Sequence, residues 1–238
     1  MGILINATER VQFQDVASLS FNGTDEYATV DDAADDVDAR YGTLSAWVKM
    51  DATSNNGAVV KISADSTNLI QMLFVNSDTT MRFYYTGDGN HSVISADFNH
   101  EGDDTWYHIC LTYDTTVGEG EEAGELKAYI NTTLKDTNVG LTNIQGTINQ
   151  FYLGRNTTTS NSFHVGHIAH VSYFNTVVSP TILYNGGKPG NLNGMDNLVL
   201  WLPMREGSGT TLKDHSPQLS DATLVNTPTW TVDTATAV

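Results

Sequence analysis

The sequence predicts an all-β fold, an antiparallel two-sheet jelly-roll sandwich with one short helix. Three observations lead to this prediction. Short segments alternate between apolar and polar residues, clusters of Gly, Asn, Asp and Pro separate those segments, and helix signals are confined to one stretch. The chain has 238 residues, of which 39% are hydrophobic, enough for the core of one large β domain. The repeat of about 40 residues that is typical of a β-propeller is not seen.

The expected strands follow one another along the chain with turns between them. Residues 18–30 read as a strand, an Asn-Gly turn and a second strand. Within 42–50 the alternation puts Leu44, Ala46 and Val48 on one face, as a half-buried strand requires. The other expected strand segments are 9–16, 57–62, 68–75, 80–85, 105–114, 124–131, 149–154 and 163–175.

One helical stretch is expected, at residues 179–187. Ser179 stands at the N-cap position, Pro180 in the first turn and glycines at the end. Residues 188–194, rich in Gly, Asn and Pro, then form a turn cluster.

The charge balance is acidic, with 28 Asp and Glu against 11 Lys and Arg and a formal net charge of −17. Such a surface repels phosphate backbones, so we expect no nucleic-acid partner. No apolar run approaches the roughly 20 residues of a membrane span, and no secretory signal opens the chain. Cys110 is the single cysteine, so the chain cannot form an internal disulfide, and we expect Cys110 to be a small buried hydrophobe.

Several segments occur in a familiar order: LSFNGTDEYATV, GTLSAWVKM, WYHICLTYD, GELKAYINTTL, FYLGRN and FHVGHIAHVSYFNTVVSPTILYNGG. This series, which covers residues 18–187, resembles the laminin G-like, concanavalin A-like lectin jelly-roll family in its phage and marine-bacterial form. The resemblance implies a single jelly-roll domain over residues 18–238, preceded by an N-terminal arm or edge strand at 1–17. It also implies that binding residues lie in the loops at the rim of the sandwich.

Residues 197–230 resemble the segment that begins many members of this family, although here they come last. Either they close the same sandwich as a C-terminal hairpin beside the first strand, or they start a truncated second repeat. A fragment of about 40 residues cannot build its own core, so we favour closure of the same sandwich. Asp214 matches a family loop residue and is expected to brace that loop through hydrogen bonds to the backbone.

Calcium is the cofactor that the resemblance implies. Calcium needs several converging oxygens, and carboxylates supply its charge. The candidate ligands are Asp25, Glu26, Asp31 and Asp32. One departure counts against the site, because the closing strand of the family carries an Asp where this chain has Ala169. A solvated acidic loop without metal therefore stays open as the alternative.

Tyr84, Tyr85 and His91 flank the turn sequence TGDGN and are the candidate ligand-binding residues, because sugars stack on exposed rings at a loop. His164, His167 and His170 are spaced by three, but on a strand they cannot converge on one zinc ion. The acidic residues that a glycosidase reading would use lie in a Gly-rich turn, so no catalytic residue is expected: Glu119, Glu121, Glu122 and Glu125.

These observations predict a non-enzymatic binding or structural module. The phage-like segments and the absence of a signal favour a virion surface protein of a tailed phage, a capsid decoration or fibre protein made in the host cytoplasm and exposed on the particle. Its expected partners are the major capsid protein or other virion proteins, sibling copies in a homo-oligomer, and cell-surface glycans. The alternatives are a free-standing, calcium-assisted carbohydrate-binding lectin and, secondly, a glycoside hydrolase.

Overall fold

The computed structural model describes residues 17–30, 32–51, 57–75, 79–98, 104–120, 123–156 and 162–235. Two helical turns are present, the 3-10 helix η1 (Ala33–Asp36) and the helix α1 (Pro180–Tyr184). All other regular elements are strands. One group comprises β1 (Ser18–Asn22), β3 (Tyr41–Met50), β8 (Tyr107–Asp114), β9 (Glu125–Ile130), β10 (Thr133–Val139), β12 (Val165–Phe174), β13 (Leu198–Leu202) and β16 (Thr229–Thr231). The other comprises β2 (Tyr27–Thr29), β4 (Gly57–Ser63), β5 (Leu69–Val75), β6 (Thr80–Gly87), β7 (Asn90–Asp97), β11 (Gln150–Leu153), β14 (Thr211–Leu212) and β15 (Ala222–Val225).

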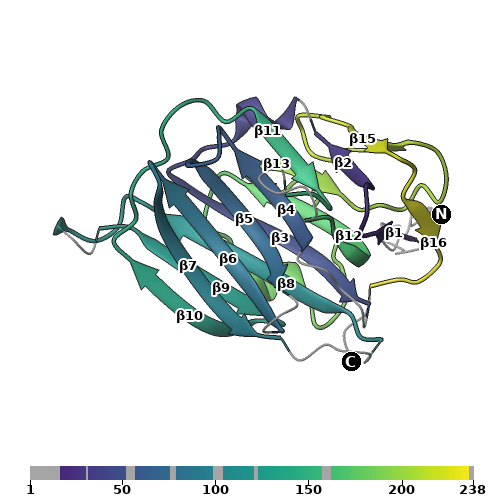
Figure 1. Cartoon of the computed structure of the whole chain (residues 1–238), viewed down its shortest axis with the longest axis horizontal. Helices are drawn as coiled ribbons and strands as arrows, with labels where there is room; N and C mark the ends of the chain where they lie inside the picture. Colours follow the sequence, from purple (N-terminus) through teal and green to yellow (C-terminus); the bar gives the residue numbers. More distant parts are fainter. Residues whose placement is uncertain are drawn as a thin grey trace, which may run out of the picture.

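The strands form two eight-stranded antiparallel sheets that pack face to face (Figure 1). Sheet A has the order β10-β9-β8-β3-β12-β1-β16, with β13 paired to β12. Sheet B has the order β14-β15-β2-β11-β4-β5-β6-β7. The predicted all-β sandwich with one short α-helix is therefore confirmed. Among the described residues, no helix has the length and apolar composition of a membrane-spanning segment.

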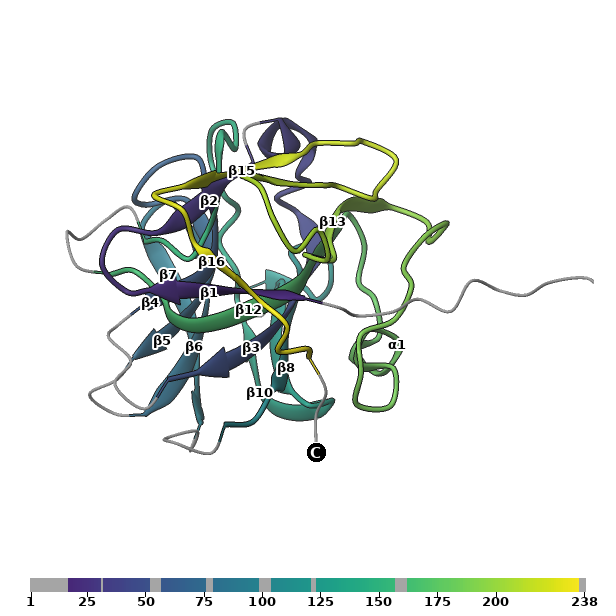
Figure 2. The same cartoon turned by 90° about the vertical axis from the view of Figure 1, so that its right-hand side faces the viewer.

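The alternation along β3 decides which side chains fill the core. Leu44, Ala46 and Val48 face sheet B and are fully buried between the sheets, as predicted. Trp47 points to the opposite face yet is also buried, in a second cluster with Trp106 and Ala169. The outer face of sheet A is covered because α1 and the turn cluster that follows it lie against it (Figure 2). This cover explains why β3 is buried on both sides.

The C-terminal segment is distributed over both sheets. β13 pairs with β12 and β16 pairs with β1, while the β14–β15 hairpin extends sheet B beside β2. Residues 197–230 thus lie in the same two sheets as the strands before them. Of the predicted N-terminal arm, residues 1–16 lie outside the described residues.

Asp214 holds the loop between β14 and β15 to the end of β13. Its Oδ1 accepts hydrogen bonds from the backbone N–H groups of Trp201 (2.9 Å) and Ser216 (2.8 Å). Its Oδ2 accepts from Ser216 Oγ (2.6 Å) and from the N–H of Ser220 (2.8 Å). The predicted bracing role of Asp214 is confirmed, and it needs no metal.

An ion cluster around the buried Lys49 fastens the C-terminal segment near Asp233 to β3. Lys49 Nζ donates to Asp104 Oδ1 at 2.6 Å and to the carboxylate of Asp233, and Trp106 Nε1 donates to Asp233 Oδ1 at 3.0 Å. Burial lowers the pKa of Lys49, but its two carboxylate partners outweigh burial, so the pKa lies above its usual value. Likewise burial alone would raise the pKa of Asp233, but the hydrogen bonds from Lys49 and Trp106 outweigh burial. The pKa of Asp233 therefore lies below its usual value.

Candidate functional site

The edge strands β7 of sheet B and β10 of sheet A lie side by side (Figure 1). A groove opens between them. Its volume is about 380 Å³, within the range of small-molecule sites in proteins. The described residues that line it are Asn90, His91, Ser92, Thr137, Asn138, Val139, Gly140 and Thr142. Side-chain amides and hydroxyls predominate, and none of these residues is Asp, Glu, Lys or Arg.

A tight hairpin turn between β6 and β7 positions the residues on one side of the groove. Asp88 and Gly89 have φ angles of 49° and 77°, and Gly87 pairs with Asn90. Two consecutive residues with positive φ are the type I′ geometry that suits the twist of a hairpin, and an Asp-Gly pair is a preferred sequence for it. β7 therefore begins at Asn90. Across the groove, Asn138 Nδ2 donates to the carbonyl oxygen of Val93 at 2.9 Å and ties the two sheet edges together.

Gly140 and Thr142, in the loop of residues 140–146, line the groove, and this loop lies against the hairpin. Asn68 Oδ1 accepts hydrogen bonds from the N–H groups of Asp88 (2.9 Å) and Gln145 (2.7 Å), so one buried amide holds both segments. At Gly87 a Cβ atom would lie only 1.9 Å from the Thr142 carbonyl oxygen. The close approach of hairpin and loop therefore requires glycine at this position.

Of the three predicted ligand-binding residues, His91 lines the groove. It is exposed, and its Nδ1 lies 3.0 Å from Thr86 Oγ1, a hydrogen bond that orients the ring. Tyr84 lies elsewhere, half-buried on the outer face of sheet B between Gln71 and Val93 in register.

The prediction for Tyr85 needs correction, because its side chain is in the core. Tyr85 is 1% exposed, and its hydroxyl donates to the Ala39 carbonyl oxygen at 2.7 Å and accepts from the N–H of Ile144 at 3.4 Å. Burial raises the pKa of Tyr85 to about 12. A ring packed in this way cannot stack on a sugar, but its hydroxyl supports the loop of residues 140–146 from below.

Of the predicted calcium ligands, Asp25 and Glu26 lie together in the turn between β1 and β2. Asp25 Oδ1 accepts a hydrogen bond from Asn22 Nδ2 (3.0 Å), and Glu26 Oε2 accepts one from the N–H of Asn22 (2.8 Å). Both carboxylates therefore stabilise the turn in which they lie. Burial raises the pKa of Glu26, which disfavours the charged form that a cation needs. Asp32 is exposed, and Asp31 lies outside the described residues. Within the described ranges no group of three or more His, Cys, Asp or Glu could hold a metal ion, and calcium binding stays a prediction.

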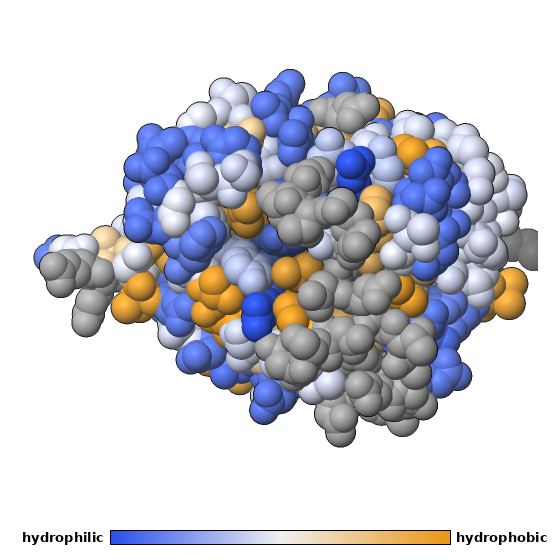
Figure 3. All heavy atoms as spheres, viewed as in Figure 1, coloured by the Kyte–Doolittle hydropathy of each residue, from blue (hydrophilic) through white to orange (hydrophobic). Residues whose placement is uncertain are grey.

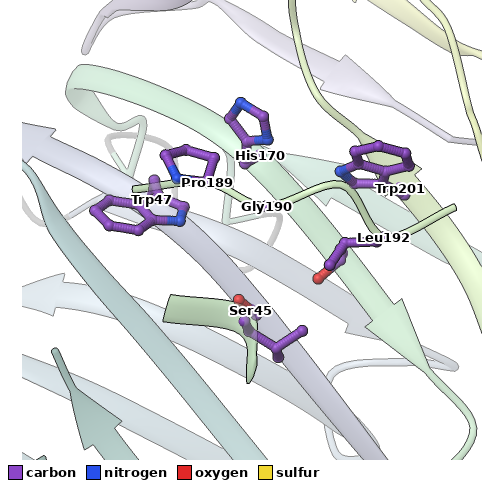
Figure 4. A pocket seen from close by; sticks show the side chains of 9 residues that line it. Ser45, Trp47, His170, Pro189, Gly190, Leu192 and Trp201 are labelled. Atoms are coloured by element: carbon purple, nitrogen blue, oxygen red, sulfur yellow. The ribbon is translucent and has the colours of Figure 1, made fainter. Parts of the chain in front are cut away.

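The three spaced histidines occupy separate environments. His164 packs edge-on against Phe21 with ring centroids 6.1 Å apart, and His167 lies edge-on to Trp106 at 6.0 Å. His170 stands at a bulge in β12, with φ 48°, and lines a small cavity on the outer face of sheet A (Figure 4).

That cavity has a volume of about 10 Å³, room for one water molecule at most. Its lining residues are Ser45, Trp47, His170, Ser172, Leu183, Pro189, Gly190, Leu192 and Trp201. The cavity is a packing feature beneath the cover of sheet A, too small for a sugar.

The carboxylates considered for hydrolysis give no facing pair among the described residues. Glu125 lies on β9 with its Oε1 2.6 Å from Lys127 Nζ, and Glu119 is exposed in the preceding turn. Glu121 and Glu122 lie outside the described residues.

Comparison with protein families gives a match to the concanavalin A-like lectin/glucanases superfamily over residues 22–182. Comparison with curated protein sequences gave no match. Several solved structures share the fold at low sequence identity.

A protein from Bacteroides ovatus ATCC 8483, named as a candidate carbohydrate binding protein, superposes with a TM-score of 0.67 at 15% identity over 95% of this chain. The present chain spans 62% of that protein's length.

Two further structures are sugar complexes of modules from enzymes. The CBM40 of the Ruminococcus gnavus IT-sialidase, bound to α2,6 sialyllactose, superposes with a TM-score of 0.53 at 13% identity, over 73% of this chain and 98% of its own. Domain 4 of a GH43 extracellular arabinanase from Geobacillus stearothermophilus, in complex with arabinotriose, superposes with a TM-score of 0.50 at 17% identity, over 71% of this chain and 75% of its own. The family match covers most of the chain and agrees with the two-sheet fold, so this protein belongs to the concanavalin A-like lectin/glucanase superfamily.

Proposed function

We propose that this protein is a non-enzymatic carbohydrate-binding module whose glycan site is the groove between β7 and β10. The observation that carries the proposal is the chemistry of the groove. Its described lining consists mainly of amides and hydroxyls without a formal charge, on a jelly-roll scaffold. Sugar hydroxyls both donate and accept hydrogen bonds, and amide and hydroxyl side chains offer the complementary groups.

The geometry favours neutral sugars. Asn90 and His91 project from the start of β7, and Thr137 faces them from β10. The Asn138 amide nitrogen is engaged with Val93, which leaves its oxygen to accept a hydrogen bond from a sugar hydroxyl. With no carboxylate or basic residue among the described lining, selection by charge is weak, and the pattern of hydroxyl groups would set specificity.

The wider surface agrees with a polar ligand. Where atoms are coloured in Figure 3, hydrophilic side chains predominate on this side of the molecule, and hydrophobic ones form small separate patches. The related CBM40 and arabinanase modules are bound to oligosaccharides, which supports the same class of ligand for this chain.

The comparisons favour the lectin alternative over display on a virion, because they name carbohydrate-binding proteins. Glycan binding is therefore the main proposal. Contact with a capsid protein, self-association and location on a phage particle stay predictions, to be tested by looking for the protein on purified particles.

A glycan array, screened with and without EDTA, tests the proposal first. We expect binding to neutral oligosaccharides that EDTA does not change, since the described groove lining offers no carboxylate for calcium. Release of reducing sugar from the bound glycans would instead support the hydrolase alternative. An array in which no neutral glycan binds would refute the proposal.

Calorimetric titration of the best neutral ligand then locates the site. His91→Ala removes a groove ring, and Thr137→Trp fills the groove. We expect each to weaken binding about tenfold or more, equivalent to roughly 1.4 kcal/mol. Asn193→Ala is the matched control, because Asn193 is exposed on the turn cluster 188–194 and does not line the groove. Equal affinities for all four proteins would place the site elsewhere.

A further inference from the structure

A second cluster with ligand chemistry lies across sheet B from the groove, around Arg155. The guanidinium carbon of Arg155 lies 4.5 Å from the ring centroid of Tyr27, 5.7 Å from that of Tyr152 and 5.8 Å from that of Phe163. Tyr27 and Tyr152 meet edge-on, with centroids 6.1 Å apart, and Tyr27 and Phe163 are 6.3 Å apart. All four side chains are half-buried, so the cluster is ordered yet reachable from solvent.

The strand register places this cluster on the outer face of sheet B. Phe151 and Leu153 of β11 are buried in the core, so Tyr152 between them points outward. Tyr27 precedes the buried Ala28 on the neighbouring strand β2. Arg155 follows β11 directly and pairs with Phe163 through an isolated bridge, which brings both residues beside the tyrosines.

The guanidinium of Arg155 lies against three aromatic rings. Ring contacts occupy the flat faces of a guanidinium, whereas its N–H donors lie in the plane and point outward. Within the described residues, the side chain of Arg155 makes ion pairs with no carboxylate. Arg40 shows the contrast, since its Nη2 lies 2.7 Å from Asp38 Oδ2. Among the described residues, Arg155 thus contacts aromatic rings and no carboxylate, in a chain with 28 acidic and 11 basic residues.

We propose that Arg155, Tyr27, Tyr152 and Phe163 form a second binding site, for a pyranose sugar that carries a carboxylate. The edge of the guanidinium donates two parallel hydrogen bonds to the carboxylate oxygens, and the rings pack against the apolar C–H face of the sugar. The chemistry is shared by uronic and sialic acids. This inference rests on the proposed carbohydrate-binding function, but its residues are separate from those of the groove.

The two sites lie on one sheet, with the groove at its β7 edge and the Arg155 cluster at β2 and β11 (Figure 1). A row of paired residues leads from β11 to β7 across the intervening strands: Tyr152, Lys61, Gln71, Tyr84 and Val93. Four strand spacings separate its ends, about 19 Å. An oligosaccharide with both neutral and acidic units therefore could contact both sites at once.

The acidic net charge of −17 opposes the approach of an anionic sugar, but this repulsion is short-ranged in salt. At 0.15 M ionic strength the screening length is about 8 Å, so the guanidinium in contact with the carboxylate decides binding. Titrations are therefore carried out at about 0.15 M salt.

The test is calorimetric titration with two acidic probes and their uncharged counterparts. The probes are a galacturonate tetramer with its methyl ester, and α2,3-sialyllactose with lactose. We expect at least one acid to bind roughly tenfold or more tightly than its counterpart, and which acid binds identifies the source of the carboxylate. Failure of both acids to bind, or equal affinity for acid and uncharged counterpart, would overturn the proposal.

Variants then assign the binding to Arg155. Arg155→Gln should lose about tenfold or more in affinity for the acid, and Arg155→Lys several-fold, because an ammonium keeps the charge without the planar fork. Arg40→Gln, at an arginine that already has a carboxylate partner, should change affinity by less than about twofold. An equal loss in Arg40→Gln would contradict the assignment.

A failure of the proposal for Arg155 can be distinguished from a failure of the proposed glycan binding at the groove. Neutral-glycan binding at the groove should be unchanged in Arg155→Gln, and acid binding should be unchanged in His91→Ala. Thermal unfolding of each variant checks that the fold is intact. Tyr152→Ala gives a second line of evidence, because it removes a stacking ring and leaves the charge; unchanged acid binding in that variant would count against the site.

Discussion

The close approach of hairpin and loop at Gly87 yields the sharpest prediction about the groove. In Gly87→Ala the new Cβ would lie 1.9 Å from the Thr142 carbonyl oxygen, whereas ordinary contacts begin at 3.4 Å, so the loop must move by about 1.5 Å. Overpacking of this kind costs about 1–3 kcal/mol. The displaced loop also strains the hydrogen bonds that Asn68 and Tyr85 make to it.

Two assays check this prediction. In calorimetric unfolding, a loss of about 1–3 kcal/mol in a chain of this size should lower Tm by roughly 2–12 °C. In titration with the neutral glycan, a displaced groove wall should weaken binding about tenfold or more. Gly89→Asn is the control, because Gly89 has open space around its Cβ position and Asn tolerates its positive φ. A Gly87→Ala protein with the Tm and affinity of the native chain would show that hairpin and loop do not need this close approach.

Three further predictions concern the rest of the fold. Asp214→Ala leaves the buried N–H of Trp201 and its neighbours without an acceptor, so it should destabilise the protein by at least about 2 kcal/mol in denaturant unfolding; a change below about 0.5 kcal/mol would show that Asp214 is not a brace. The pKa of Asp233 is lowered in the folded state, so its contact with Lys49 contributes stability above the usual Asp pKa of about 3.9, and that contribution is lost as pH falls through the lower folded pKa. The stability difference between native protein and Asp233→Asn should therefore shrink below about pH 4, and a difference independent of pH would contradict this. Cys110 is buried and burial raises its pKa, so thiol reagents should label it only on unfolding; rapid labelling of the native protein would show that sheet A is open there.

The sandwich could be predicted because alternation along each strand reports which side is buried. In β3 the alternation of Leu44, Ala46 and Val48 with Ser45 and Trp47 matches the two faces of the strand. What the alternation does not reveal is the cover on the outer face of sheet A. Burial of Trp47 there depends on contacts with residues far away in the sequence, such as Tyr184, whose ring stacks on it at 5.7 Å.

The groove could not be predicted from the sequence, for a related reason. His91 and Thr137 belong to different sheets, and they face one groove only because the edges of those sheets converge. The polar residues of β10 have the sequence pattern of an ordinary solvent-exposed edge strand. Nothing local to either segment signals the other.

The prediction that Tyr85 binds a ligand failed for a different reason, because the sequence did contain a pattern that indicates burial. Met81, Phe83 and Tyr85 share one face of β6 by the two-residue period, and that face is buried. The turn next to Tyr85 suggested exposure, but the period of the strand continued up to the turn and kept the ring in the core.

Binding of a neutral glycan in the groove between β7 and β10 can be observed residue by residue. The most direct measurement is a two-dimensional amide NMR titration with the best neutral ligand from the array. We expect the largest shift changes on residues 90–92 and 137–142. Shift changes confined to other parts of the sandwich, or no shift changes at ligand concentrations that saturate the array, would contradict this expectation.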